Sequence, residues 1–176
     1  GPIVELDKII LEPGDDIQIN GLSGDLKFSG KGSNKVQFLE QVKNSAYTLK
    51  EFGSFRYQDT LRVSKLLDHY DKCQQFTLNL LKEYRESISP LTYEILVADI
   101  VGKNQMSKIY LGGNFNLKDS IKRSEFLNLY KARFIEEPAP LIGELNNEAL
   151  GLSMYFSEFI LKRLTADESY FYLNHT

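Results

Sequence analysis

The chain has 176 residues, of which 42% are hydrophobic and 26% are charged. This is the ordinary composition of a soluble globular protein, long enough for one domain with a core, and it excludes wholesale disorder. The formal net charge is −3, which argues against a nucleic-acid-binding protein because such proteins present a basic face to phosphates. No window approaches the roughly 20 apolar residues that span a bilayer.

The first thirty residues predict short β-strands. Two turn signals separate them, namely Pro13-Gly14 and the run between Gly21 and Gly24. The runs of β-branched or alternating residues predict strands over residues 3–11, 16–20 and 25–28. Strands this short do not form a stable sheet alone, so they either pack on helices or belong to a larger sheet whose other strands lie upstream.

From Ser33 onward the apolar residues recur every three or four positions, which predicts helices. Ser33 or Asn34 is expected to cap the first of them. Ser89 followed by Pro90 marks another helix start, since proline is favoured at the first helical position. The expected helices cover residues 33–49, 59–87, 90–112, 117–134 and 141–164, the last with an interruption near Gly151, and a short final helix capped by Asp167.

These patterns predict a mainly α (α+β) fold. A short N-terminal antiparallel β element in residues 1–30 is followed by a bundle-like domain of five to six helices in residues 31–176. The sequence shows no repeat of fixed period, so a helical repeat array is not expected.

The stretch FSGKGSNK, residues 28–35, resembles the outline of a phosphate-binding loop. Such a loop needs a glycine five positions before its Gly-Lys pair and a hydroxyl residue after it, but Asp25 and Gly32 occupy these positions. The dinucleotide pattern needs a third glycine where Lys35 stands. We therefore interpret the stretch as a connection between strand and helix, with anion binding at the helix end as its remaining chemical role.

His69 and Cys73 are four residues apart and could touch on one helix face. A thiolate–imidazole pair is a known nucleophile, but Cys73 lies in an apolar stripe, where a buried core cysteine is the favoured interpretation. The acidic pairs Asp15-Asp16 and Glu136-Glu137 are expected to be solvated. The sequence therefore predicts no catalytic, cofactor-binding or metal-binding residues.

Three stretches together resemble a known family. They are LEPGDDIQI at residues 11–19, LKFSGKGSNKVQFL at 26–39 and SPLTYEILVADI at 89–100. They are similar to the region upstream of the thioredoxin domain in bacterial thiol:disulfide oxidoreductases of the TlpA/ResA-like type. That family's redox chemistry uses a Cys-x-x-Cys pair, whereas Cys73 is the only cysteine here, so no catalytic residue is carried over.

The resemblance implies a non-catalytic accessory or linker domain of a secreted, periplasmic or cell-envelope thioredoxin-like protein whose parent could be membrane-anchored. Its role would be positioning, dimerisation or partner binding, with a protein partner or self-association and no nucleic acid. The alternative is a stand-alone helical protein–protein interaction module that uses the β-hairpin as an edge for strand addition. A third alternative, ranked well behind, is an enzyme that uses His69 and Cys73.

Overall fold

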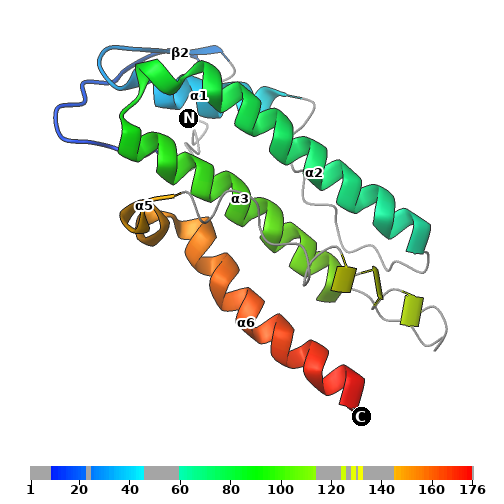
Figure 1. Cartoon of the computed structure of the whole chain (residues 1–176). Coiled ribbons are helices and arrows are strands. Elements are labelled where there is room, and N and C mark those ends of the chain that lie inside the picture. Colours follow the sequence, from blue (N-terminus) through cyan, green and yellow to red (C-terminus); the bar gives the residue numbers. More distant parts are fainter. Residues whose placement is uncertain are drawn as a thin grey trace.

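The computed structural model describes residues 9–22, 25–45, 60–113 and 145–175, together with six residues between 124 and 132. In this part of the chain the fold is mainly α, with a two-stranded sheet followed by five α-helices (Figure 1). The elements are β1 (Gln18–Leu22), β2 (Asp25–Ser29), α1 (Ser33–Asn44), α2 (Thr60–Glu83), the 3-10 turn η1 (Arg85–Ser87), α3 (Pro90–Gly113), α5 (Asn147–Leu152) and α6 (Met154–His175).

The β element is a single antiparallel pair in which Ile19 of β1 lies opposite Phe28 of β2. It is preceded by the expected turn, where the Asp15 amide donates to the Glu12 carbonyl oxygen at 3.1 Å. Gly14 has a φ of 88°, as the third position of a type II turn requires. The predicted strand over residues 16–20 is present two residues later, and that over 25–28 is confirmed. The predicted strand over residues 3–11 is wrong at residues 9–11, which are not in a strand, and its remainder lies outside the described residues.

Helix α1 starts at the predicted residue, but by a different device from the predicted side-chain cap. Gly32 is the N-cap, with a φ of 88° and no side-chain hydrogen bond. The Ser33 amide donates to the Gly30 carbonyl oxygen at 3.2 Å, and the Asn34 amide group donates to the Ser87 carbonyl oxygen at 3.4 Å. The prediction that Ser33 or Asn34 caps the helix is therefore wrong, because the left-handed backbone at Gly32 makes the turn.

The α2–α3 connection follows the sequence signals closely. Helix α2 ends at Glu83, and a 3-10 turn leads to Ser89. The Ser89 hydroxyl accepts from the Thr92 amide at 3.1 Å, which is the N-cap bond that the Ser-Pro pair predicts. Helix α3 begins at Pro90 and ends at Gly113, so both of its predicted ends are confirmed within one residue.

Helix α3 is the central element of the molecule, with α2 on one side and α5 and α6 on the other (Figure 1). One apolar cluster joins α1, α2 and α3 through Phe38, Leu78, Leu81, Leu96, Val97 and Val101. A second joins α3 to α6 through Ala98, Met106, Ile109, Phe156 and Phe159, and Leu150 of α5 packs against it. Helix α3 thus packs on two sides and is buried on both.

The C-terminal region divides into α5 and α6 at Ser153, two residues after the interruption predicted near Gly151. The Ser153 hydroxyl accepts from the Phe156 amide at 3.1 Å and so caps α6. Helix α6 then continues to His175, so the separate short helix capped by Asp167 is wrong. Most of the helix predicted over residues 117–134 lies outside the described residues. No helix in the described ranges is both long and apolar enough to cross a membrane.

Candidate functional site

The glycine loop of residues 30–32 is held against the segment that precedes β1 by a backbone hydrogen bond. The Asp16 amide donates to the Lys31 carbonyl oxygen at 2.9 Å. A side chain on Gly30 would overlap the Asp16 carbonyl oxygen, and one on Gly32 would overlap the Asp15 carboxylate. The loop therefore faces a carboxylate where a phosphate would have to sit, and like charges repel.

Lys35, on the first turn of α1, is almost completely buried at 3% exposure. Its ammonium group binds the Glu12 carboxylate at 3.0 Å and the Asp15 carboxylate at 2.6 Å. The Ser89 hydroxyl, at the start of α3, donates to the other Glu12 oxygen. We call these four residues the Lys35 cluster. The expectation that Asp15 is solvated is wrong, because its carboxylate is the counterion of a buried lysine; Asp16 is exposed as expected.

The ionisation of the cluster matches its geometry. Burial acts to raise the pKa of Glu12, but hydrogen bonds from Ser89 and Lys35 outweigh it and lower the pKa. The hydrogen bond from Lys35 lowers the pKa of Asp15. For Lys35, burial acts to lower the pKa, and the hydrogen bonds to Asp15 and Glu12 raise it. All three groups are thus held in their charged forms.

The three sequence stretches of residues 11–19, 26–39 and 89–100 meet at the Lys35 cluster. The first supplies Glu12 and Asp15, the second Lys35 and the third Ser89. Their turn and cap residues therefore form one structural unit, which joins the β element to the helices. Each of the four residues of the Lys35 cluster bonds to another member, as a structural cluster requires.

His69 and Cys73 are in contact on α2, with the Cys73 Sγ atom 3.4 Å from the His69 Nε2 atom. The Cys73 side chain is 1% exposed, and burial raises the pKa of its thiol. A reactive cysteine has a lowered pKa and an accessible sulfur. The interpretation of Cys73 as a core residue is confirmed by its burial.

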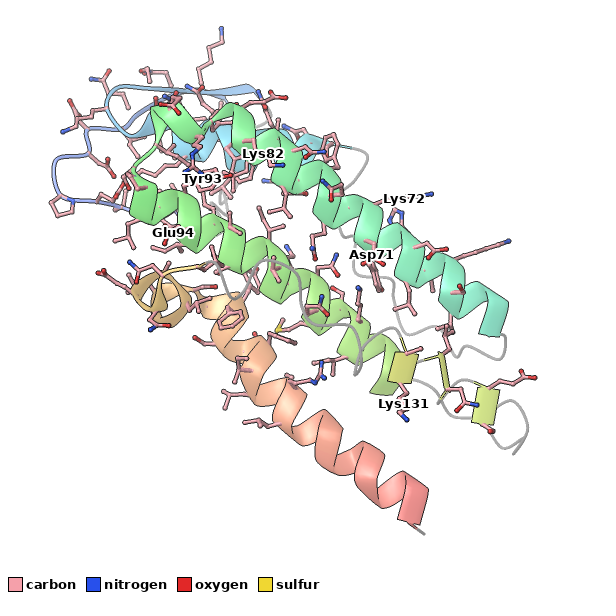
Figure 2. The ribbon with its side chains drawn as sticks, in the orientation of Figure 1. Asp71, Lys72, Lys82, Tyr93, Glu94 and Lys131 are labelled. Atoms are coloured by element: carbon pink, nitrogen blue, oxygen red, sulfur yellow. The ribbon has the colours of Figure 1, made fainter. Side chains whose placement is uncertain are left out.

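Polar groups also lie in the interface between α2 and α3. The periodicity of the sequence had predicted only apolar residues on the buried faces of these helices. Asn104 is fully buried and donates to the Tyr70 carbonyl oxygen at 2.5 Å. Lys108 is 5% exposed and pairs with Asp71 at 2.6 Å, and Figure 2 shows Asp71 on the side of α2 that faces α3. In the sequence, Asn104 and Lys108 are polar residues four positions apart within an apolar stretch. This spacing was the available signal for their contacts with α2.

On its other side α3 holds the start of α5 and of α6. The Glu94 carboxylate, labelled in Figure 2, accepts from the Asn146 amide at 3.2 Å, next to the α5 N-terminus. The Asp99 carboxylate accepts from the Ser153 hydroxyl at 2.5 Å and from the Tyr155 amide at 3.3 Å. These carboxylates orient helix starts, where negative charge is favoured by the helix dipole.

On the described surface, large exposed apolar side chains occur singly at Leu11, at Ile19 of β1 and at Leu152 of α5, and as a group on α6. Four large side chains there are between 41% and 67% exposed: Met154, Ile160, Leu161 and Leu164. We call these residues the α6 stripe. Phe156 and Phe159, which pack against α3, are 8% and 4% exposed on the inner side of the same helix. Sequence reasoning treated residues 141–164 as one helical pattern and did not separate the two apolar faces.

Within the described ranges, no group of three or more His, Cys, Asp or Glu residues is arranged to hold a metal ion. Glu136 and Glu137 lie outside these ranges. No protein-family model, curated protein or solved structure matches this chain. The α6 stripe is the largest group of exposed apolar side chains on one described helix, and it is the candidate functional site.

Proposed function

We propose that this chain is a non-catalytic accessory module that acts through contact with another protein surface. The α6 stripe carries the proposal, because exposed apolar side chains grouped on one helix are typical of protein-binding sites. The polar clusters described above are engaged in internal links. The one thiol is in the core, with a raised pKa.

A site-specific photo-cross-linker tests this proposal. Ser157 is exposed between Met154 and Leu161, and Gln41 is an exposed control position on α1. In the cells that produce the chain, a cross-linker at residue 157 is expected to form a protein adduct that Leu161→Lys abolishes. The same group at residue 41 is expected to form none. No adduct at residue 157, or the same adducts at both positions, contradicts the proposal.

The absence of catalysis needs its own measurement. The chain is expected to leave the rate of insulin reduction by dithiothreitol unchanged, because exchange of this kind requires an accessible thiolate. A rate increase that Cys73→Ala removes would assign redox chemistry to Cys73 and overturn the non-catalytic part of the proposal.

A finer form of the proposal places the module in a secreted, periplasmic or cell-envelope thioredoxin-like oxidoreductase. It is supported by the three family-like stretches, which supply all four residues of the Lys35 cluster and so belong to one unit. The gene is then expected to encode a Cys-x-x-Cys motif within about 200 residues after Thr176, the length of one further domain. A reading frame without this motif would remove the redox attachment and leave the stand-alone binding module.

A further inference from the structure

The β element has little apolar attachment to the helices. We call residues 9–31, which include β1 and β2, the strap. Among the strap residues whose burial the structure describes, Phe28 is the only buried one, and Gln37 of α1 donates to its carbonyl oxygen at 3.0 Å. Ile10 is partly buried against the cluster that joins α1, α2 and α3, whereas residues 18–21 are exposed. A two-stranded hairpin is at best marginally stable alone, so the strap depends on its other contacts with the helices.

The Lys35 cluster supplies the polar part of that attachment. The Glu12 carboxylate bonds to two helix starts, namely to Lys35 in the first turn of α1 at 3.0 Å and to Ser89, the N-cap of α3. The Asp15 carboxylate binds the same ammonium group at 2.6 Å. Figure 1 shows the strap, in blue, passing the start of α3 and continuing into the strands beside α1. The cluster therefore fastens the strap to two helices at once.

The helices keep their own contacts without the strap. Among the described elements, the two strands contact chiefly each other and α1. The buried residues of the two apolar clusters, which join α1 to α2 and α3 and join α3 to α6, all belong to the helices. Proteins open locally in cooperative units, and the units with few buried apolar contacts open at the lowest free energy. The strap has the properties of such a unit.

We infer that the strap opens as a unit while α2, α3 and α6 remain folded, and that the Lys35 cluster is the latch that keeps it closed. Opening separates Glu12 and Asp15 from Lys35 and Ser89, so that water reaches all four side chains. A detached hairpin does not remain folded, and its amides then exchange with solvent. The strap contains no residue of the α6 stripe, so the inference is independent of the proposed function.

Hydrogen exchange followed by NMR tests the latch. The Asp16 amide, which donates to the Lys31 carbonyl oxygen at 2.9 Å, reports on the strap, and the amide of buried Val97 reports on α3. In the wild type, the protection factor of Asp16 is expected to be at least about tenfold lower than that of Val97. Lys35→Met is expected to lower the protection of Asp16 by about a hundredfold, the effect of breaking a buried ion pair. The control Lys43→Met, at an exposed lysine, is expected to change it less than about fivefold.

Gly102→Ala distinguishes opening of the strap from unfolding of the whole chain. A Cβ atom at residue 102 would lie 2.5 Å from the Phe156 amide nitrogen, so this variant disturbs the contact between α3 and α6, which lies outside the strap. It is expected to lower the protection of Val97 by roughly thirtyfold, as overpacking does, and to leave that of Asp16 unchanged. Equal losses at the two amides would show that the strap opens only when the helices unfold, and would overturn the inference.

Unchanged protection of Asp16 in Lys35→Met would also overturn the inference, because the strap would then open without breaking the cluster. If Lys35→Met does not fold, Glu12→Gln replaces it, since the amide keeps the shape of the side chain and removes its charge. Glu12→Gln is expected to lower the protection of Asp16 by about tenfold, as the loss of hydrogen bonds to a charged group does. No change at Asp16 in this variant rejects the latch.

Discussion

The ammonium group of Lys35 lies in a site where its side chain is 3% exposed, between Glu12 at 3.0 Å and Asp15 at 2.6 Å. Removing Lys35 would leave the Glu12 and Asp15 carboxylates, which are 27% and 12% exposed, next to each other without their cation. The cost is therefore expected to exceed that of losing a surface pair, whose net contribution is small.

Lys35→Met is predicted to lower the free energy of unfolding by about 3 kcal/mol, the usual cost of breaking a buried ion pair. Lys43→Met is the matched control, since Lys43 is 61% exposed and lies 3.8 Å from Glu40. The control is expected to change stability by less than about 1 kcal/mol. Urea unfolding followed by circular dichroism measures both, and equal losses in the two variants would contradict the role of burial.

Cys73 is predicted to react slowly with an aromatic disulfide reagent in the native protein. Burial raises the pKa of the thiol and leaves its side chain 1% exposed, and only an accessible thiolate attacks a disulfide. The labelling rate is expected to rise at least tenfold in denaturing urea. Fast labelling of the folded chain, at the rate of a free thiol, would show that the sulfur is accessible.

At the scale of elements, Gly102 sets the distance between α3 and α6. A Cβ atom at this position would lie 2.5 Å from the Phe156 amide nitrogen and 2.6 Å from the Tyr155 carbonyl carbon. Both are backbone atoms that a rotamer change cannot move away. The two helices therefore pack this closely because residue 102 has no side chain.

Gly102→Ala is predicted to destabilise the protein by about 2 kcal/mol, as overpacking in a core does, although alanine is the better helix former. Gly151→Ala is the matched control, because a Cβ atom there would meet nothing within 4 Å. The control is expected to raise stability by about 0.5–1 kcal/mol through helix propensity. Thermal unfolding compares the two variants, and a stabilising effect of Gly102→Ala would contradict the close approach of the helices.

At the scale of the whole molecule, the Lys35 cluster couples pH to the attachment of the β element. The pKa values of Glu12 and Asp15 are lowered in the folded protein. Their contribution to stability is therefore fully present at pH values above about 4, the pKa of these carboxyl groups in the unfolded chain. It is lost as the pH falls through the folded values. The pKa of Lys35 is raised, so its contribution is present at neutral pH and is lost only as the pH rises through its folded value.

Wild-type stability is therefore predicted to fall between about pH 5 and pH 2, the range in which carboxylates with lowered pKa values take up protons. The decrease is expected to be smaller in Lys35→Met, because Glu12 and Asp15 no longer have their cation. Lys43→Met serves again as the control and should keep the full decrease. Urea unfolding at several pH values measures the difference, and identical pH profiles for wild type and Lys35→Met would contradict the coupling.

Local signals predicted much of the fold. The Pro13-Gly14 turn, the Ser89-Pro90 helix start and the periodicity of α2 depend on residues near one another in the chain. The prediction failed where backbone geometry or packing overrode a local preference. Gly32 replaced the expected side-chain cap of α1, and α6 continued past Asp167.

The sequence by itself determined the mainly α class, the order of the elements and the core position of Cys73, because helical periodicity and turn chemistry act over a few residues. Only the tertiary structure decided that Asp15 pairs with Lys35, that Gly102 lies against α6 and that the α6 stripe remains exposed. Each of these depends on which segments meet across tens of residues. Neither helix propensity nor periodicity specifies which distant segments contact one another. The packing of α3 between α2 and α6 does.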